Sequence, residues 1–449
     1  MRKIFLKSYY TTLFLPLLLI IFLGTNTHAV EQEIEPLPTA IDPEAAPDLT
    51  EKITPKFFWG AKLNLDFRTR NNRDLQDNDQ DGDFRSTGKV SAAGLYVFDP
   101  SATGSRLELF GEVGIEHQIT HEKDESKTSD ETDLELKQGS FNWKSFLHPS
   151  LRLQVGRQKF KDFREWIYDE NLDAVRLYYV EGPLELQLSL STNLIDPEDV
   201  EDEINNIILF GIYDIWKKDK IAAYIVNRQG QFDEDDPDFN LTSVGVSLKG
   251  KSIKNQKYWL DAAIVTGDEK AKDVQGYGFD LGWTSRFKYR FKPAITIGYA
   301  FGSGDHTPDN NKDKAFRQTG LQDNSTKFRG KSKVKLYGEL FEPELSNLMI
   351  GTIGIGIRPI KNGSIDLVYH HYRQVWALQE RKNDLRDVGI KEDPNGESRD
   401  LGDEVDIIFG WKVSDKIKIE ALAAYFLPGT AFPDTDNAFL AKVKARYSF

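Results

Sequence analysis

Two segments of the 449-residue chain, 62–70 and 442–446, carry basic residues only at even-numbered positions. The members of the two rows are Lys62, Arg68, Arg70, Lys442, Lys444 and Arg446. Side chains an even number of positions apart lie on the same face of an extended strand. In a narrow, water-filled passage such rows concentrate anions and replace part of their hydration. The rows therefore predict anion binding. The alternative is ordinary ion pairing with acids such as Asp66, Glu404 and Asp406.

Apolar residues alternate with polar ones in these segments and in several others. The clearest alternating segments are 59–70, 107–116, 277–287, 405–413 and 439–449. Their lengths are close to the roughly 9–11 residues of a tilted membrane strand. Charged inward residues are costly in a packed core but are solvated in a wet lumen, while lipid covers the other face. The sequence therefore predicts an all-β fold, a transmembrane antiparallel β-barrel. Because first and last strands are neighbours when a barrel closes, we expect the two basic rows to face each other across the closing seam.

Short and long polar connections alternate along the chain, with long ones near 120–132 and 268–275 among others. This is expected when turns are periplasmic and loops extracellular. The segment 331–341 has the pattern of a further strand, but one more crossing would place the turn at 359–363 on the outer side. We therefore assign 303–346 to one long loop, and one interpretation is that it folds inward as a plug. The pattern predicts about eighteen strands, give or take two.

The N-terminus has the pattern of an exported protein. A basic start, an apolar core at 13–23 and small residues up to Ala29 predict a signal peptide over 1–29. Residues 30–55 are acidic and proline-rich, which predicts a disordered periplasmic leader, and the barrel then occupies 56–449. The chain has no cysteine and a net charge of -13. Disulfides are excluded, and nucleic acid is not an expected partner.

Several stretches resemble the alginate-export outer-membrane porins. The most specific are FRQTGLQDN at 316–324 and PELSNL at 343–348, and the others lie at 153–158, 173–176, 302–305, 337–339 and 367–370. Their order and spacing match that family over about 57–449. The resemblance implies a monomeric barrel of eighteen strands in the outer membrane of a Gram-negative bacterium. It also implies a lumen lined with arginine and lysine that lets an anionic uronate polysaccharide leave the cell.

Further candidate pore-lining residues lie between the two basic rows. Parity places Arg152, Arg176 and Arg286 on inward faces. The resemblance suggests that a charged loop approaches the pore mouth, with Arg157, Asp162, Arg164, Glu165, Trp166 and Asp169. In the long loop, groups that can bond sugar hydroxyls and carboxylates are Arg317, Gln318, Gln322, Asp323 and Asn324. The alternative for the charged loop is a surface loop whose charges pair with one another. The alternative for the long loop is a constriction with a purely structural role.

One acidic stretch has the spacing of a calcium loop. Asp77, Asp79 and Asp81 place oxygens at alternate positions before Gly82, but position twelve is Gly88 rather than a bidentate glutamate. A solvated acidic loop is the alternative, and no other cofactor is expected. Catalytic motifs such as a nucleophile elbow or a P-loop are absent, so we do not expect an enzyme.

The sequence thus favours a passive outer-membrane channel for an anionic, alginate-like exopolysaccharide. Because no nucleotide site is present, energy must come from synthesis or from a periplasmic export partner. The alternative is a diffusion porin for small anions or sugars. A lipid-modifying barrel enzyme is a third reading, and it would need a nucleophile and a base clustered near the membrane rim.

Overall fold

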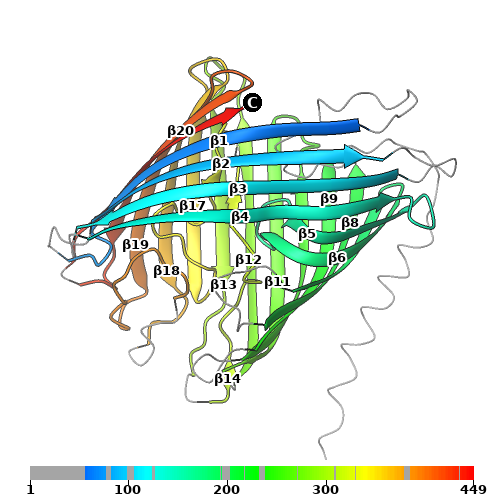
Figure 1. Ribbon diagram of the computed structural model, residues 1–449. Coiled ribbons are helices and arrows are strands. Elements are labelled where there is room, and N and C mark those ends of the chain that lie inside the picture. The colour runs from blue at the N-terminus through cyan, green and yellow to red at the C-terminus, as the bar shows by residue number, and fades with distance from the viewer. Residues whose placement is uncertain are drawn as a thin grey trace, which may run out of the picture. The chain divides into compact units, whose positions relative to one another are not determined.

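Consecutive strands pair with each other from residue 56 to the C-terminal end of the chain. The computed structural model describes residues 56–76, 82–98, 106–123, 127–192, 194, 203–216, 218–231, 238–270, 272–307, 310–328, 330–378, 385–433 and 435–449. Within these ranges, eighteen long strands each pair antiparallel with two neighbours (Figure 1). The last strand pairs with the first, so the sheet closes into a barrel. The predicted fold and strand number are confirmed.

The barrel strands vary from nine to eighteen residues. In chain order they are β1 (Lys56–Asn71), β2 (Asp83–Val97), β3 (Arg106–Glu122), β4 (Lys127–Lys144), β5 (Leu151–Lys161), β6 (Asp169–Glu181), β7 (Leu184–Thr192), β8 (Glu203–Trp216), β9 (Asp219–Gln231), β10 (Phe239–Gly250), β11 (Gln256–Glu269), β12 (Lys272–Arg286), β13 (Ala294–Gly302), β17 (Leu348–Ile357), β18 (Gly363–Gln374), β19 (Asp400–Lys412), β20 (Ile417–Pro428) and β21 (Ala438–Ser448). Among the described residues, no helix is long and apolar enough to cross a membrane.

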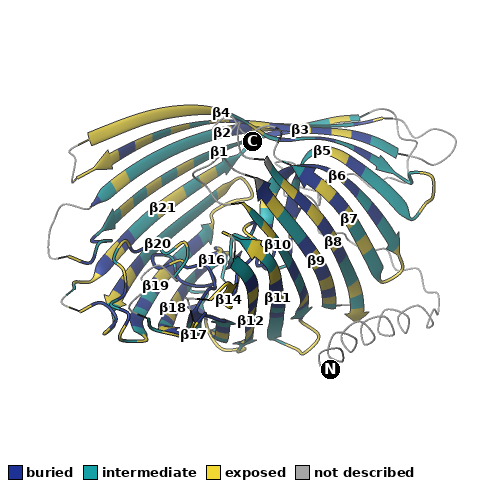
Figure 2. Cartoon of the chain, turned by 90° about the horizontal axis from the view of Figure 1, so that it is seen from below, coloured by how far each residue is buried: buried dark blue, intermediate teal, exposed yellow. Residues whose placement is uncertain are grey.

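The two faces of the sheet have opposite chemistry. Large apolar side chains point outward and are exposed, such as Trp59 and Ile297, with exposed fractions of 69% and 62%. Acidic side chains on the inner face, such as Asp261 and Glu404, are fully buried. Exposed and buried residues alternate along the strands in Figure 2. This inversion of a globular fold is what a lipid-facing wall around a polar interior requires.

Two connections are tighter than the sequence predicted. Loops were expected near 120–132 and 268–275, but β3 and β4 are joined by 123–126 and β11 and β12 by 270–271. The polar residues of these regions belong to strands, because backbone pairing continues there without apolar alternation. Since polar residues carry no period-two signal, the strand ends could not be found from the pattern.

The long segment between β13 and β17 folds into the barrel, and we call residues 303–347 the plug. It contains three two-residue strands: β14 (Lys312–Asp313), β15 (Ser325–Thr326) and β16 (Val334–Lys335). Figure 2 shows β16 within the ring of strands. Phe341 of the plug stacks on Phe426 and contacts Tyr372, with ring centroids 5.1 Å and 4.5 Å apart. The inward-folded reading of this loop is confirmed, and 331–341 is not a barrel strand.

The predicted signal peptide (1–29), the leader (30–55) and the calcium loop at Asp77, Asp79 and Asp81 lie outside the described residues.

A charge on the lipid face should destabilise the barrel far more than a charge lost from the lumen. Val443 lies in the middle of β21 on the outer face, with an exposed fraction of 48%. We expect Val443→Arg to lower the free energy of unfolding by about 2–4 kcal/mol. Its neighbour Lys442 points inward, and Lys442→Gln should cost less than about 1 kcal/mol. Urea unfolding in lipid vesicles measures both, and the reverse order would show that the faces are assigned wrongly.

Candidate functional site

One carboxylate on β19 holds the plug against the barrel wall. Glu404 Oε1 accepts hydrogen bonds from the backbone N–H groups of Glu339 and Leu340, at 2.7 and 2.8 Å. Its Oε2 accepts one from Phe341 at 2.8 Å. Gly338 permits this close approach, because its φ is +97° and a Cβ there would lie 2.7 Å from Glu404 Oε2. Glu404 therefore satisfies three backbone donors of the plug with its two carboxyl oxygens.

The plug also contacts a second inward loop, 162–168, between β5 and β6. Trp166 Nε1 donates to the Tyr337 hydroxyl at 2.7 Å, and Gln318 Nε2 donates to the Trp166 carbonyl at 3.3 Å. The backbone N–H groups of Asp323 and Asn324 donate to the carbonyl of Glu165. The two segments are therefore bonded together inside the barrel.

Arg164 anchors the 162–168 loop to the inner face of β11 and β12. Its guanidinium lies 2.7 Å from Asp261 and 3.1 Å from Asp280 and stacks on Trp259, 4.5 Å from the ring centroid. Although burial opposes it, Asp280 and Asp261 raise the pKa of Arg164 above its ordinary value. The guanidinium stays charged, and both carboxylates have a counter-ion.

Three carboxylates from these segments offer oxygens within 4.8 Å of one another: Glu165, Asp169 and Asp323. Lysines already bond each of them. Lys333 lies 2.5 Å from Glu165, Lys161 lies 3.1 Å from Asp169, and Lys335 lies 2.8 Å from Asp323. Despite burial, Lys335 lowers the pKa of Asp323 to about 2. The lysines supply the positive charge that a metal ion would bring, so the cluster is an ion-pair network.

The inner faces of β20, β21 and β1 form what we call the seam wall. Its charged members are Lys418, Glu420, Lys442, Lys444, Arg446, Lys62, Asp66, Arg68 and Arg70, seven cations and two acids. The strands that carry the two basic rows are neighbours, as predicted, but only Arg68 faces a member of the other row, Lys442. Lys444 and Arg446 lie opposite Asp66 and Asn64. Lys442 and Lys444 share one partner, each 3.5 Å from Asp66, and Arg446 donates to Asn64 at 2.9 Å. Cations outnumber acids along this wall.

The plug adds a cation, Lys327, within electrostatic reach of the seam wall, where Lys418 is itself paired with Glu420 at 2.7 Å. Burial and the charge of Lys418 lower the pKa of Lys327, which lies within electrostatic reach of Arg446 as well. We call Lys327, Lys418, Lys444 and Arg446 the basic passage. Sequence reasoning missed two of these residues. Lys418 lies on the inner face of β20, and the alternation of apolar and polar residues could have identified it. Lys327 lies in the irregular plug, where no such alternation exists.

Arg152 and Arg176 lie on inward parity, as their strands predicted, but aromatic rings hold them. The Arg152 guanidinium lies 3.7 Å from the ring centroid of Tyr178, and that of Arg176 lies 3.4 Å from Phe160. Arg176 is buried and also donates to Ser189 Oγ and the Tyr178 hydroxyl. These two arginines are packed into the wall.

Arg157 lies within β5 rather than in the loop that follows it. It pairs with Asp173 at 3.0 Å across the β5–β6 ladder. The register puts this pair on the face of Val155, which is exposed on the outer side. Arg157 is therefore not positioned by a loop at the pore mouth, because the strand continues past Gly156.

The other predicted lining residues are engaged in varied ways. Arg70 lies 2.5 Å from Asp83, with Arg68 at 3.6 Å from the same residue. Asp406 is buried, 3.7 Å from His370. Arg286 lies at the end of β12, next to one of the short turns.

The polar residues predicted to bind sugar from the long loop bond mainly to protein groups. Arg317 lies 3.0 Å from Glu269 and 2.6 Å from Asp313. Gln318 and Asn324 exchange side-chain hydrogen bonds at 3.0 Å. Gln322 accepts a bond from the N–H of Gly320. These contacts shape the plug, and sugar binding by these residues stays a prediction.

Comparison with known proteins identifies relatives over nearly the whole barrel. The family model described as "Alginate export" matches residues 59–445. The "Alginate production protein AlgE" of Pseudomonas aeruginosa is 29% identical over 191 residues, 37% of each chain. AlgE of Azotobacter vinelandii is 29% identical over 147 residues, 31% of this chain and 29% of that protein. The matched part spans only about a third of the length of these curated relatives.

Solved structures show the same fold at low sequence identity. OccK7 (OpdD) of Pseudomonas aeruginosa is 10% identical, with a TM-score of 0.56 over 88% of this chain and 98% of that one. OccK11 (OpdR) of the same organism is 14% identical, with a TM-score of 0.53 over 87% and 96%. At such identities these neighbours support the barrel architecture alone.

Removal of the Glu404 carboxylate should release the plug. Glu404→Ala leaves three buried N–H groups unsatisfied, and each costs about 1–3 kcal/mol. We expect a higher and noisier single-channel conductance in planar bilayers. Asp403→Ala, one residue away on the outer face, is the matched control and should leave conductance unchanged. An unaltered Glu404→Ala channel would show that the plug is held by other contacts.

Plug packing should weaken as the pH rises. Burial raises the pKa of Glu339 and Glu344 to about 7, above the ordinary value of 4.5. Their contribution to plug stability is fully present below pH 4.5 and is lost as the pH rises through 7. Conductance should therefore increase from about pH 5 to about pH 8. The double variant Glu339→Gln/Glu344→Gln should flatten this dependence, and a conductance that falls with pH would contradict the assignment.

Proposed function

Since the chain belongs to the alginate-export family, we propose that its barrel lets an anionic, alginate-like polysaccharide cross the Gram-negative outer membrane, where it is located, by passive passage. The observation that carries this proposal is the seam wall, in which Lys442 and Lys444 share the single carboxylate of Asp66 and Arg446 bonds the neutral amide of Asn64. A row of cations with few local acids, along a narrow, wet route, replaces part of the hydration of a carboxylate-bearing chain. The polymer can exchange one cation for the next as it advances.

The proposal involves no catalysis. The charged groups around the plug, such as Glu404 and Arg164, are engaged in bonds that position backbone and carboxylates. Because the sequence has no nucleotide-binding motif, the direction of transport must come from polymer synthesis or from a periplasmic partner that delivers the chain.

Charge reversal in the basic passage should abolish anion preference. We expect Lys327→Glu/Arg446→Glu to lower the anion-to-cation permeability ratio several-fold and to remove channel block by uronate oligosaccharides. Lys361→Glu, in the exposed turn between β17 and β18, changes the net charge without touching the passage and should behave as the native chain. Reversal potentials in planar bilayers under a salt gradient measure the ratio.

Liposome swelling with the native channel distinguishes this proposal from a diffusion porin for small solutes. A general porin admits neutral sugars by size, so liposomes containing the protein would swell in neutral monosaccharides. Cation preference of the native channel, or free entry of neutral sugars without uronate block, would overturn polysaccharide export.

A further inference from the structure

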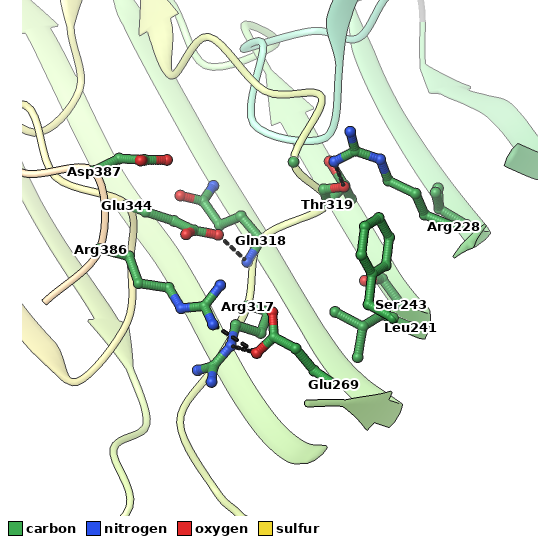
Figure 3. Close-up of a pocket in the computed structure, with 13 residues that line it drawn as sticks. Arg228, Leu241, Ser243, Glu269, Arg317, Gln318, Thr319, Glu344, Arg386 and Asp387 are labelled. Carbon is green, nitrogen blue, oxygen red and sulfur yellow. Dashed lines mark hydrogen bonds and ion pairs between the residues drawn. The ribbon is translucent and has the colours of Figure 1, made fainter. Parts of the chain in front are cut away.

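A pocket of about 290 Å³ lies between the barrel wall and the plug, and it shares no residue with the basic passage (Figure 3). The ends of β9, β10 and β11 contribute Arg228, Phe239 and Glu269, and the plug contributes 317–320. These strand ends belong to the side of the barrel with the long connections, which is the extracellular side. The pocket is therefore at the exit of the barrel.

Two of the three guanidinium groups in the pocket already have counter-ions. Arg317 and Arg386 share the carboxylate of Glu269, at 3.0 and 2.6 Å. Glu344 accepts a hydrogen bond from the N–H of Gln318 at 2.9 Å. These groups form a closed network on one side of the pocket, as the dashed lines in Figure 3 show.

Arg228 differs from them. One of its terminal nitrogens donates to the carbonyl of Thr319 at 3.3 Å, but its Nε is buried without a hydrogen-bond partner. Among the described residues, no carboxylate lies within ion-pair distance of Arg228. Gly320 keeps space for the guanidinium, since a Cβ there would lie 1.8 Å from its terminal nitrogen and its φ is +73°. Arg228 is half-buried, and the carboxylates that attract it, those of Glu344 and Glu170, make no ion pair with it among the described residues. An anionic ligand in direct contact would offset the cost of its partial burial.

The surroundings of Arg228 suit a sugar acid better than a small inorganic ion. The Phe239 ring centroid lies 5.6 Å from the guanidinium carbon, and Val226 and Leu241 extend this apolar surface. Ser243 offers a hydroxyl group, whereas the hydroxyl of Thr319 already donates to the carbonyl of Ile167. A guanidinium binds a planar carboxylate through two parallel bonds, and an apolar ring face packs against the C–H face of a sugar. The volume is at the small end of ligand pockets, which are about 300–1,000 Å³.

We infer that this pocket is an exit site that binds a single uronate unit, with Arg228 holding the sugar carboxylate and Phe239 packing on the ring. The inference rests on the proposed function for its sugar class. It adds a second anion site, outside the basic passage, that engages the polymer after it has crossed.

Calorimetric titration of the purified full-length barrel with a mannuronate trisaccharide tests the site. We expect Arg228→Gln to weaken binding about tenfold or more, because a charge-assisted bidentate contact is lost. Phe239→Leu should weaken binding of the trisaccharide while keeping the charge. The matched control is Arg290→Gln, since Arg290 also stacks on a phenylalanine, Phe291 at 4.7 Å, but in an exposed periplasmic turn. The control should bind as the native chain, and far-UV circular dichroism checks folding of each variant.

The outcomes separate the two proposals. Native affinity in both Arg228→Gln and Phe239→Leu, or an equal loss in Arg290→Gln, would overturn the exit site. If the native chain binds no trisaccharide yet remains anion-selective and blocked by long uronate chains, the exit site is wrong and export stands. If anion selectivity is absent as well, the proposed function fails with it.

Discussion

Every backbone polar group in a membrane must find its partner within the protein, and this constraint determines the rest of the structure. Lipid offers no hydrogen bonds, so a sheet that crosses it cannot leave an edge open. Closure requires β1 to pair with β21. The two basic rows, almost four hundred positions apart, become neighbours for that reason alone. The requirement for backbone hydrogen bonding therefore explains why the seam wall exists, whatever its function.

Closure also creates an interior too wide for wall side chains to fill, and the plug occupies part of it. A buried segment without regular pairing must find other partners for its N–H groups, and some of these are side chains. Glu404 performs this role for the turn at 339–341, and Arg164 secures the companion loop through Asp261 and Asp280. Charged inward residues, which would be a liability in a packed core, are here the means by which irregular backbone is held in place.

The predictable part of the structure is the part governed by a local period. Alternation at 59–70 and 439–449 predicted which side chains point inward. Closure of the barrel then makes the first and last strands neighbours, and in the structure Lys442 lies opposite Arg68. Arg157 was assigned to a loop because nothing local indicates that β5 continues past Gly156. The contacts of Lys327, Glu404 and Arg228 depend on where a 45-residue segment docks, which is set by tertiary contacts across hundreds of positions.

An anion route inside a chain of net charge -13 requires that charges be separated in space. The acids near the plug already have partners. Glu404 accepts hydrogen bonds from backbone N–H groups, Asp261 and Asp280 pair with Arg164, and Glu269 pairs with two arginines. The seam wall has seven cations against two acids of its own, and Asp83 of β2 pairs with two of these cations, Arg68 and Arg70. Since Coulomb interactions fall off within about 8–10 Å in salt, a polymer senses this local excess rather than the total. The overall acidity therefore does not oppose passage of an anion, because several of the inward acids are bonded to the plug and its companion loop and do not line the seam wall.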